Sequence, residues 1–214
     1  MWLVPAALAG PLVDGERLAW RVSWMGVDAG EAWATLHARG EAWAVEAGCR
    51  SARWLAPLYP IDDLLWSEPG RYRTRFREGG FQQDQDMRFG PDALVVARSQ
   101  LIDGAWKQWE DRYPAAPGAE DPVSAFYRLR EDAVAGGEAR FPLFTGRRVV
   151  EVVAAAVDEG DRLAVHVRRG EDGPDVKDAM TVWLSDDADR VPVEAVIQTR
   201  AGPVRVTLEA RSVE

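Results

Sequence analysis

The sequence predicts an all-β fold: an antiparallel meander that forms a barrel or a curved half-barrel, with one helix at about Pro122–Val134 packed across it. Three observations predict it. Short runs alternate between apolar and polar residues, as strands with one buried face do. Turn signals separate these runs at intervals of roughly ten residues. A single convincing helix start, Asp121-Pro122, interrupts the pattern.

The alternation is clearest at the start of the chain, where Leu18, Trp20, Val22 and Trp24 share one strand face. We expect both tryptophans, Trp20 and Trp24, in the core. Similar runs follow along the whole chain. The expected strands are Gly15–Trp24, Ala32–Ala38, Trp43–Cys49, Leu64–Ser67, Tyr72–Glu78, Phe81–Phe89, Ala93–Ser99, Trp106–Arg112, Ala139–Phe144, Val149–Asp158, Arg162–Arg169, Val176–Leu184, Pro192–Thr199 and Val204–Ala210.

The sequence predicts both ends of the helix. Asp121 can cap the free N–H groups of the first turn, Pro122 suits the first helical position, and Gly136-Gly137 ends the helix. An apolar stripe follows helical spacing, formed by Val123, Phe126, Tyr127, Ala133 and Val134.

Arg130 projects from the middle of that stripe. Because an unpaired buried charge is very costly, Arg130 needs a carboxylate or carbonyl partner. We favour a structural ion pair that docks the helix on the sheet, with Asp62 and Asp63 as the candidate partners. The alternative is that Arg130 binds an anion or a polar ligand at the mouth of a cavity.

The segment Ser51–Asp63 breaks the strand rhythm with two prolines and several large apolar residues. It predicts a structured loop whose apolar side chains, Trp54, Leu55, Leu58 and Tyr59, tuck into one end of the core. Asp62 and Asp63 follow directly. A carboxylate pair can do acid–base chemistry, although such a pair more often caps a turn or forms an ion pair with an arginine.

Composition limits the function classes. The chain has 214 residues, of which 47% are hydrophobic and 29% charged, as in a folded soluble protein with one domain. The net charge of −9 disfavours nucleic acid and anionic membrane surfaces as partners. Arginines 71, 73, 75 and 77 form a basic strand face, for which we expect cross-strand pairing with Asp84, Asp86 and Asp92.

Catalytic and metal signatures are missing from the sequence. Cys49 is the only cysteine, so it forms neither an internal disulfide nor a cysteine metal cluster. His37 and His166 fall in strand patterns and are expected to be solvated rather than metal ligands. We therefore predict no metal and no cofactor, and we do not expect an enzyme. A hydrolase that uses Asp62 or Asp63 remains a minor alternative.

The first twelve residues, Met1–Leu12, are apolar and contain Ala7-Leu8-Ala9, which resembles a signal-peptide cleavage site. They lack the positive start of a full signal peptide. We expect residues 1–12 to be a leader remnant or an apolar N-terminal tail, and residues 13–214 to form a single β domain.

Several segments together resemble a known family. They are Gly15–Gly30, Leu58–Asp63, Asp121–Arg130, Val182–Val193 and Gly202–Leu208. In this order they are similar to a bacterial exported family catalogued as domain of unknown function 3108, and the resemblance runs from about Gly15 to the end of the chain. It implies an exported, mainly antiparallel β protein of the periplasm or cell envelope. It supplies no established activity, and the short leader leaves a cytoplasmic location open.

We expect an envelope protein that binds a small ligand, a glycan or a lipid, in the cavity of its curved sheet. Tyr127 and Arg130 would face the lumen. The expected rim residues are Trp54, Tyr59, Asp62 and Asp63. Because these candidates mix aromatic rings with charge, a glycan is slightly favoured over a lipid, which would need an empty apolar lumen.

The alternative is a structural or assembly protein of the envelope that acts through protein–protein contacts. A large exposed apolar patch would support that alternative. Membrane contact is expected to be peripheral at most. The sequence leaves the oligomeric state open.

Overall fold

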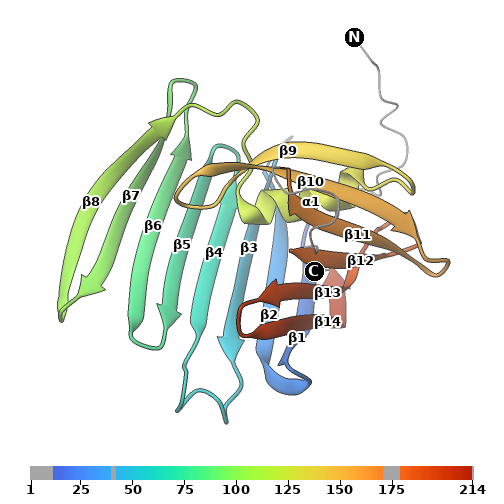
Figure 1. Ribbon diagram of the computed structural model, residues 1–214, viewed down its shortest axis with the longest axis horizontal. Helices are drawn as coiled ribbons and strands as arrows, with labels where there is room; N and C mark the ends of the chain where they lie inside the picture. The colour runs from blue at the N-terminus through green and yellow to red at the C-terminus, as the bar shows by residue number, and fades with distance from the viewer. Residues whose placement is uncertain (1–11, 40–41, 171–178, 214) are drawn as a thin grey trace.

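The computed structural model describes residues 12–39, 42–170 and 179–213, which form fourteen strands and one helix (Figure 1). The elements are β1 (Glu16–Trp24), β2 (Val27–Arg39), β3 (Ala42–Ser51), β4 (Asp62–Glu68), β5 (Arg71–Glu78), β6 (Phe81–Phe89), β7 (Ala93–Ile102), β8 (Ala105–Pro114), α1 (Pro122–Asp132), β9 (Glu138–Phe144), β10 (Val149–Asp158), β11 (Arg162–Arg169), β12 (Met180–Ser185), β13 (Pro192–Thr199) and β14 (Gly202–Val213).

Every strand expected from the alternating pattern is present, so the all-β prediction is confirmed. The expected start of one strand at Val176 lies outside the described residues, and β12 is described from Met180. The predicted leader also lies outside them, except for Leu12, which packs against the core.

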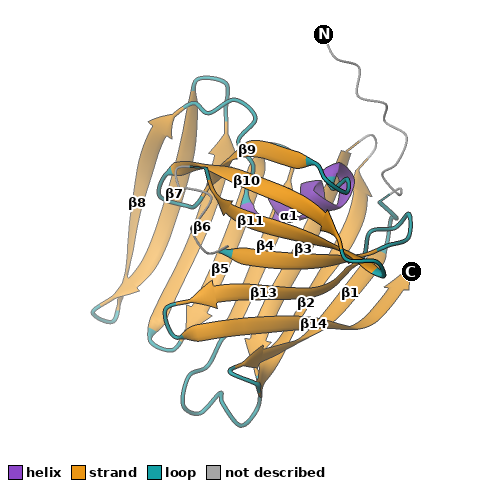
Figure 2. Ribbon diagram, turned by 45° about the vertical axis from the view of Figure 1, so that its right-hand side comes forward, coloured by secondary structure: helices purple, strands orange, loops and turns teal. Residues whose placement is uncertain are grey.

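All fourteen strands belong to one antiparallel sheet, in the order β8-β7-β6-β5-β4-β3-β2-β1-β14-β13-β12-β11-β10-β9. The sheet rolls up so that β9–β13 lie over the layer that begins the chain (Figures 1 and 2). Its two end strands, β8 and β9, are not hydrogen-bonded neighbours. The sheet is therefore an open roll, and the predicted curved half-barrel is confirmed.

Side chains bridge the open seam of the roll. The rings of Tyr113 on β8 and Phe144 on β9 have centroids 5.1 Å apart. Arg98 on β7 donates a hydrogen bond to the carbonyl oxygen of Gly146, just after β9. Arg98 also binds Asp111 at 2.6 Å. The ring pair and the Arg98–Gly146 bond hold the two ends of the sheet together where backbone hydrogen bonds do not, and Asp111 on β8 positions the Arg98 guanidinium.

Helix α1 lies inside the roll and contributes to two apolar clusters. Val123 and Tyr127 pack with core residues of the first strands, whereas Ala125 and Leu129 pack with β10–β13. The helix thus separates the two halves of the core. It ends at Asp132, so the predicted end at Val134 was two residues too long. Val134 is exposed and does not continue the apolar stripe.

The predicted start of the helix is confirmed. The carboxylate of Asp121 accepts hydrogen bonds from the backbone N–H groups of Val123 at 2.8 Å and Ser124 at 3.0 Å. The hydroxyl of Ser124 accepts one in return from the N–H of Asp121 at 3.0 Å. This reciprocal cap satisfies donors that the first helical turn would otherwise leave free.

Two-residue turns join β1 to β2 and β7 to β8. At Met25-Gly26 both residues have positive φ, 50° and 83°, and at Asp103-Gly104 the values are 53° and 77°. Two central residues in the left-handed region match the hairpin turn whose twist follows that of its strands. The β1–β2 turn and the β3–β4 loop consequently lie at one end of the first layer (Figure 1).

The outer face of this layer carries the basic strand. Arg71 pairs with Asp86 at 2.7 Å, and Arg77 pairs with Asp84 at 2.8 Å. The expected cross-strand charge pairing is therefore present for these two acids.

Among the described residues, no helix is long and apolar enough to cross a membrane.

Candidate functional site

Arg130 and Tyr127 lie inside the fold rather than at a cavity mouth. The Arg130 guanidinium donates to both carboxylate oxygens of Glu16, at 2.6 and 3.2 Å, and to the carbonyl oxygen of Asp189 at 3.1 Å. Arg130 also lies over the Tyr127 ring, 5.5 Å from its centroid. The need for a carboxylate was predicted correctly, but Asp62 and Asp63 were the wrong partners.

Glu16 is the centre of a wider buried network. It is fully buried, and its carboxylate accepts a hydrogen bond from the Nε of a second arginine, Arg211, at 2.9 Å. Arg211 in turn binds the Asp189 carboxylate at 2.6 Å. The network ties β1, α1, β14 and the β12–β13 turn together. Such a network serves the fold. It engages both terminal nitrogens of Arg130, and the side chain is only 4% exposed, so Arg130 does not face a ligand at a cavity mouth.

Asp62 and Asp63 point to opposite faces of β4 because successive strand residues alternate. Asp62 is exposed and pairs with Arg75 at 3.4 Å on the outer face. Asp63 is buried, and its carboxylate accepts the backbone N–H of Arg77 at 2.8 Å. The two side chains do not share one site.

Trp54 and Tyr59 lie on the β3–β4 loop and are half exposed, so the expectation that this loop tucks into the core was wrong. The loop forms its own turns, in which the N–H groups of Leu55 and Tyr59 bind the carbonyl oxygens of Ala52 and Leu55. The Trp54 indole N–H donates to the Asp28 carbonyl at 2.9 Å. The loop is therefore held in place at the surface by its own turns and by the Trp54 indole.

An apolar pocket of about 420 Å³ opens beside this loop. Its surface is almost entirely apolar. The residues that line it are Val22, Trp24, Ala29, Gly30, Glu31, Cys49, Arg50, Ser51, Leu55, Tyr59, Ile61, Ala201 and Val204. Three parts of the sheet meet here: the β1–β3 strand ends, the β3–β4 loop and the β13–β14 turn. Of the six predicted site residues, only Tyr59 lines this pocket.

Trp24 explains why the pocket was missed from sequence. Alternation placed Trp24 on the buried face with Trp20, but Trp24 is 41% exposed and Trp20 only 7%. Its expected core position was therefore wrong. The indole N–H of Trp24 donates to the carbonyl oxygen of Ala201 at 2.9 Å, which holds the ring against the β13–β14 turn.

Two carboxyl groups lie directly behind the pocket wall. Asp63 is opposite the pocket residue Cys49 in the β3–β4 register, and the Cys49 sulfur is 3.9 Å from the Asp63 carboxylate. Burial raises the pKa of Glu78, and the charge of the neighbouring Asp63 adds to the rise, as does a hydrogen bond that protonated Glu78 donates to Asp63. Burial raises the pKa of the Cys49 thiol to about 12, and Asp63, Glu78 and Asp62 add to the rise.

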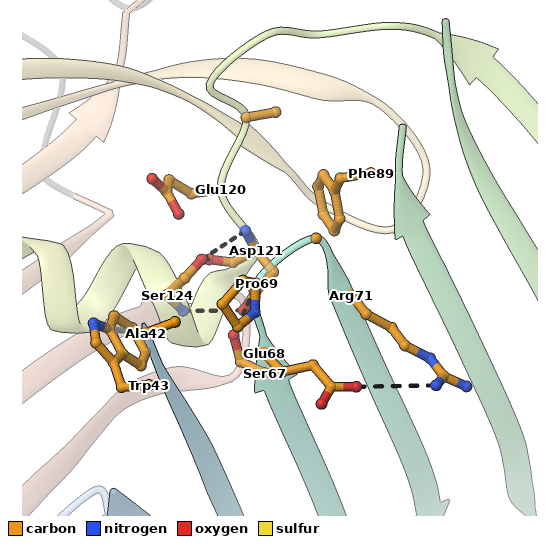
Figure 3. Close-up of a pocket in the computed structure, with 12 residues that line it drawn as sticks. Ala42, Trp43, Ser67, Glu68, Pro69, Arg71, Phe89, Glu120, Asp121 and Ser124 are labelled. Atoms are coloured by element: carbon orange, nitrogen blue, oxygen red, sulfur yellow. Dashed lines mark hydrogen bonds and ion pairs between the residues drawn. The ribbon is translucent and has the colours of Figure 1, made fainter. Parts of the chain in front are cut away.

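A second, polar pocket of about 280 Å³ lies at the start of α1 (Figure 3). Figure 3 shows Asp121, Ser124 and Ser67 between the rings of Trp43 and Phe89. Burial raises the pKa of Asp121. The Asp121 carboxylate also accepts the Ser67 hydroxyl at 2.7 Å in addition to its bonds within the cap.

The polar groups of this second pocket are already used by the protein. Asp121 caps the helix, and Glu120 pairs with Arg128 at 3.3 Å. Glu68 lies 3.9 Å from Arg71. The apolar pocket, in contrast, presents aliphatic and aromatic surface with no partner in the described fold. It is therefore the better candidate for a ligand site.

Comparisons with known proteins place the fold. A model of the family described as "Protein of unknown function (DUF3108)" matches residues 19–209. No curated protein matches the chain. One similar solved structure is the crystal structure of a beta-barrel-like protein of domain of unknown function DUF1849 from Brucella abortus. It shares 8% identity over 94% of this chain and 98% of that chain, with a TM-score of 0.59. At this identity the likeness concerns the fold alone.

Proposed function

Since the chain belongs to the family of proteins of unknown function DUF3108, whose description names no activity, we propose a function from the geometry: it binds the apolar chain of a lipid in the pocket beside the β3–β4 loop. The observation that carries the proposal is the almost wholly apolar lining of a pocket that opens to solvent. Its volume of about 420 Å³ falls in the usual range of small-molecule sites, roughly 300–1,000 Å³.

The lining supports a lipid rather than the slightly favoured glycan. A sugar needs convergent hydrogen-bonding side chains, yet Arg130 and Asp62 are engaged elsewhere in the fold. An apolar chain needs only surface to cover. Burial of apolar surface contributes about 25 cal/mol per Å², so an apolar chain in this pocket gains favourable free energy without any polar contact.

The cell envelope is the place that we propose for this binding. The family resemblance supports it, because it implied an exported protein. Fractionation of the native host, with detection of the protein in the periplasmic and membrane fractions, tests this part. Recovery in the cytoplasm alone would contradict it.

A second candidate, an assembly protein that binds a partner, is favoured by a specific observation. The exposed apolar residues of the β1–β2 turn and the β3–β4 loop lie around the same end of the sheet: Trp24, Met25, Val27, Trp54, Leu58 and Tyr59. Large exposed apolar patches often mark protein interfaces. An apolar partner segment would cover this patch and need not enter the pocket.

The test is a fluorescence titration with N-phenyl-1-naphthylamine, an uncharged apolar probe. We expect saturable binding by the wild type and a roughly tenfold weaker affinity for Trp24→Ala, because this ring forms part of the pocket wall. The matched control is Trp106→Ala. Trp106 is 46% exposed, like Trp24, but lies on β8 outside the pocket. Equal effects of the two variants, or no binding by the wild type, would overturn the lipid proposal and leave the assembly protein.

A further inference from the structure

We propose that the apolar pocket accepts amphiphiles with an uncharged or cationic head group and discriminates against anionic ones such as fatty acids. This inference rests on the proposed function, because it concerns the selectivity of the same pocket. It is carried by the two carboxyl groups that lie behind the pocket wall.

The position of the two acids is fixed by strand pairing. Asp63 is the register partner of Cys49, and the bridge partner of the pocket residue Ile61 is Glu78. Each acid thus sits one strand away from a residue that lines the pocket. Asp63 is only 6% exposed, and it is anchored by the backbone N–H of Arg77. Asp63 cannot swing into bulk solvent without breaking this contact.

The charges around the pair do not neutralise it. Asp62 belongs to the outer face, where it pairs with Arg75. The Arg77 guanidinium is directed to Asp84 and to the carbonyl oxygens of Phe76 and Gln83. Glu31 and Arg50, which line the pocket, pair with each other. Among the described residues, no ion pair links Asp63 or Glu78 to a basic side chain, so the wall keeps a net negative charge.

The charge lies close to the pocket surface, because the sulfur of the pocket residue Cys49 is 3.9 Å from the Asp63 carboxylate. After burial, the charges of Asp63, Glu78 and Asp62 are the next causes that raise the pKa of the Cys49 thiol, in that order. A fixed negative potential therefore exists at a surface that a ligand would touch. An anionic head group held at about 6–10 Å from one net negative charge would bind roughly tenfold to a hundredfold more weakly, at an effective dielectric constant of about 20.

The experiment compares three probes with the same twelve-carbon chain: dodecyltrimethylammonium, dodecyl maltoside and dodecanoate. Each displaces N-phenyl-1-naphthylamine from the wild type at pH 7.5 and fixed ionic strength, below its micelle concentration. We expect dodecanoate to bind at least tenfold more weakly than the other two. In Asp63→Asn/Glu78→Gln we expect that gap to shrink at least fivefold, with the affinity for dodecyl maltoside unchanged.

The control variant Asp62→Asn removes one charge on the outer face of the same strand, the weakest of the three carboxylate charges that act on Cys49, so it tests whether a loss of charge outside the pocket wall changes the selectivity. It should leave the order of the three probes unchanged. If the double variant does not fold, Glu78→Gln alone provides the same comparison. Equal binding of all three probes by the wild type would overturn the selectivity and keep the proposed function. No displacement by any probe would overturn both.

Discussion

Arg130 and Glu16 form a two-pronged ion pair in the interior, 114 residues apart in the chain, with oxygen–nitrogen distances of 2.6 and 3.2 Å. Only 4% of the Arg130 side chain and none of the Glu16 side chain is exposed to solvent. This pair joins the single helix to the first strand, and it shows that the buried arginine of the helix stripe has a scaffolding role.

Loss of the buried arginine Arg130 should destabilise the protein far more than loss of a surface arginine on the same helix. We expect Arg130→Ala to lower the free energy of unfolding by roughly 3–5 kcal/mol, because it leaves the Glu16 carboxylate buried without its main partner. Urea denaturation measures this loss. Arg128→Ala on the same helix is the control, and removal of its partly exposed pairs with Asp132 and Glu120 should cost only about 1 kcal/mol. Equal costs would contradict the buried role of Arg130.

The two tryptophans of β1 should differ in their contribution to stability. Trp20 is buried and its indole N–H donates to the Pro192 carbonyl at 2.9 Å, so Trp20→Ala should cost roughly 3–5 kcal/mol. Trp24→Ala should cost about 1 kcal/mol, as is usual for a partly exposed residue. Thermal and urea unfolding of the two variants test this difference. A cost for Trp24→Ala as large as that for Trp20→Ala would mean that Trp24 belongs to the core.

Glu78 should make stability fall as the pH rises. Its folded-state pKa is raised by burial and by Asp63, so between the ordinary pKa and the raised one the folded state binds more protons than the unfolded state. The folded state then loses stability as the pH rises through this window. We expect Glu78→Gln to be more stable than the wild type above the window and to lose that advantage below it. Urea midpoints between pH 4 and 8 test this, and an advantage independent of pH would contradict it.

The helix cap offers a fourth comparison. Asp121→Ala should cost roughly 1–2 kcal/mol, because it leaves the N–H groups of Val123 and Ser124 without their acceptor. Asp121→Asn keeps an oxygen acceptor and should cost less. Helical signal and urea stability of the two variants provide the measurement. If Asp121→Asn were the more damaging change, the charge rather than the cap would be the main contribution of Asp121.

Alternation along the chain was sufficient to predict every strand, and on β1 it separated the core-facing residues Leu18 and Trp20 from the exposed Arg17 and Arg21. It also indicated that Glu16 is buried, because Glu16 stands two residues before Leu18 and four before Trp20 and therefore lies on the same strand face. A buried carboxylate on β1 and a buried arginine on α1 require partners. Their meeting depends on how the sheet rolls, which no local pattern specifies.

The candidate pocket could not be predicted for a related reason. Strand alternation predicts which face of the sheet a side chain lies on, but it does not say how far along the strand the core extends. Trp24 stands at the end of β1, beyond the apolar layer that Trp20 joins. The pocket also needs Val204 from β14, which reaches β1 only in the folded sheet. Of the predicted loop residues, Tyr59 lines this pocket, but the pocket is not the cavity with Tyr127 and Arg130 for which Tyr59 was named.

The unclosed seam leaves the sheet with two free edges, and free edges invite strand addition by other chains. The two edges are protected in different ways. β9 contains Pro142, which has no N–H group, and its edge is partly covered by Glu120, which exchanges backbone hydrogen bonds with Pro142 and Phe144. β8 carries charge along its length at Lys107, Glu110, Asp111 and Arg112. The borders of the open roll thus resist fibre-like growth by other chains.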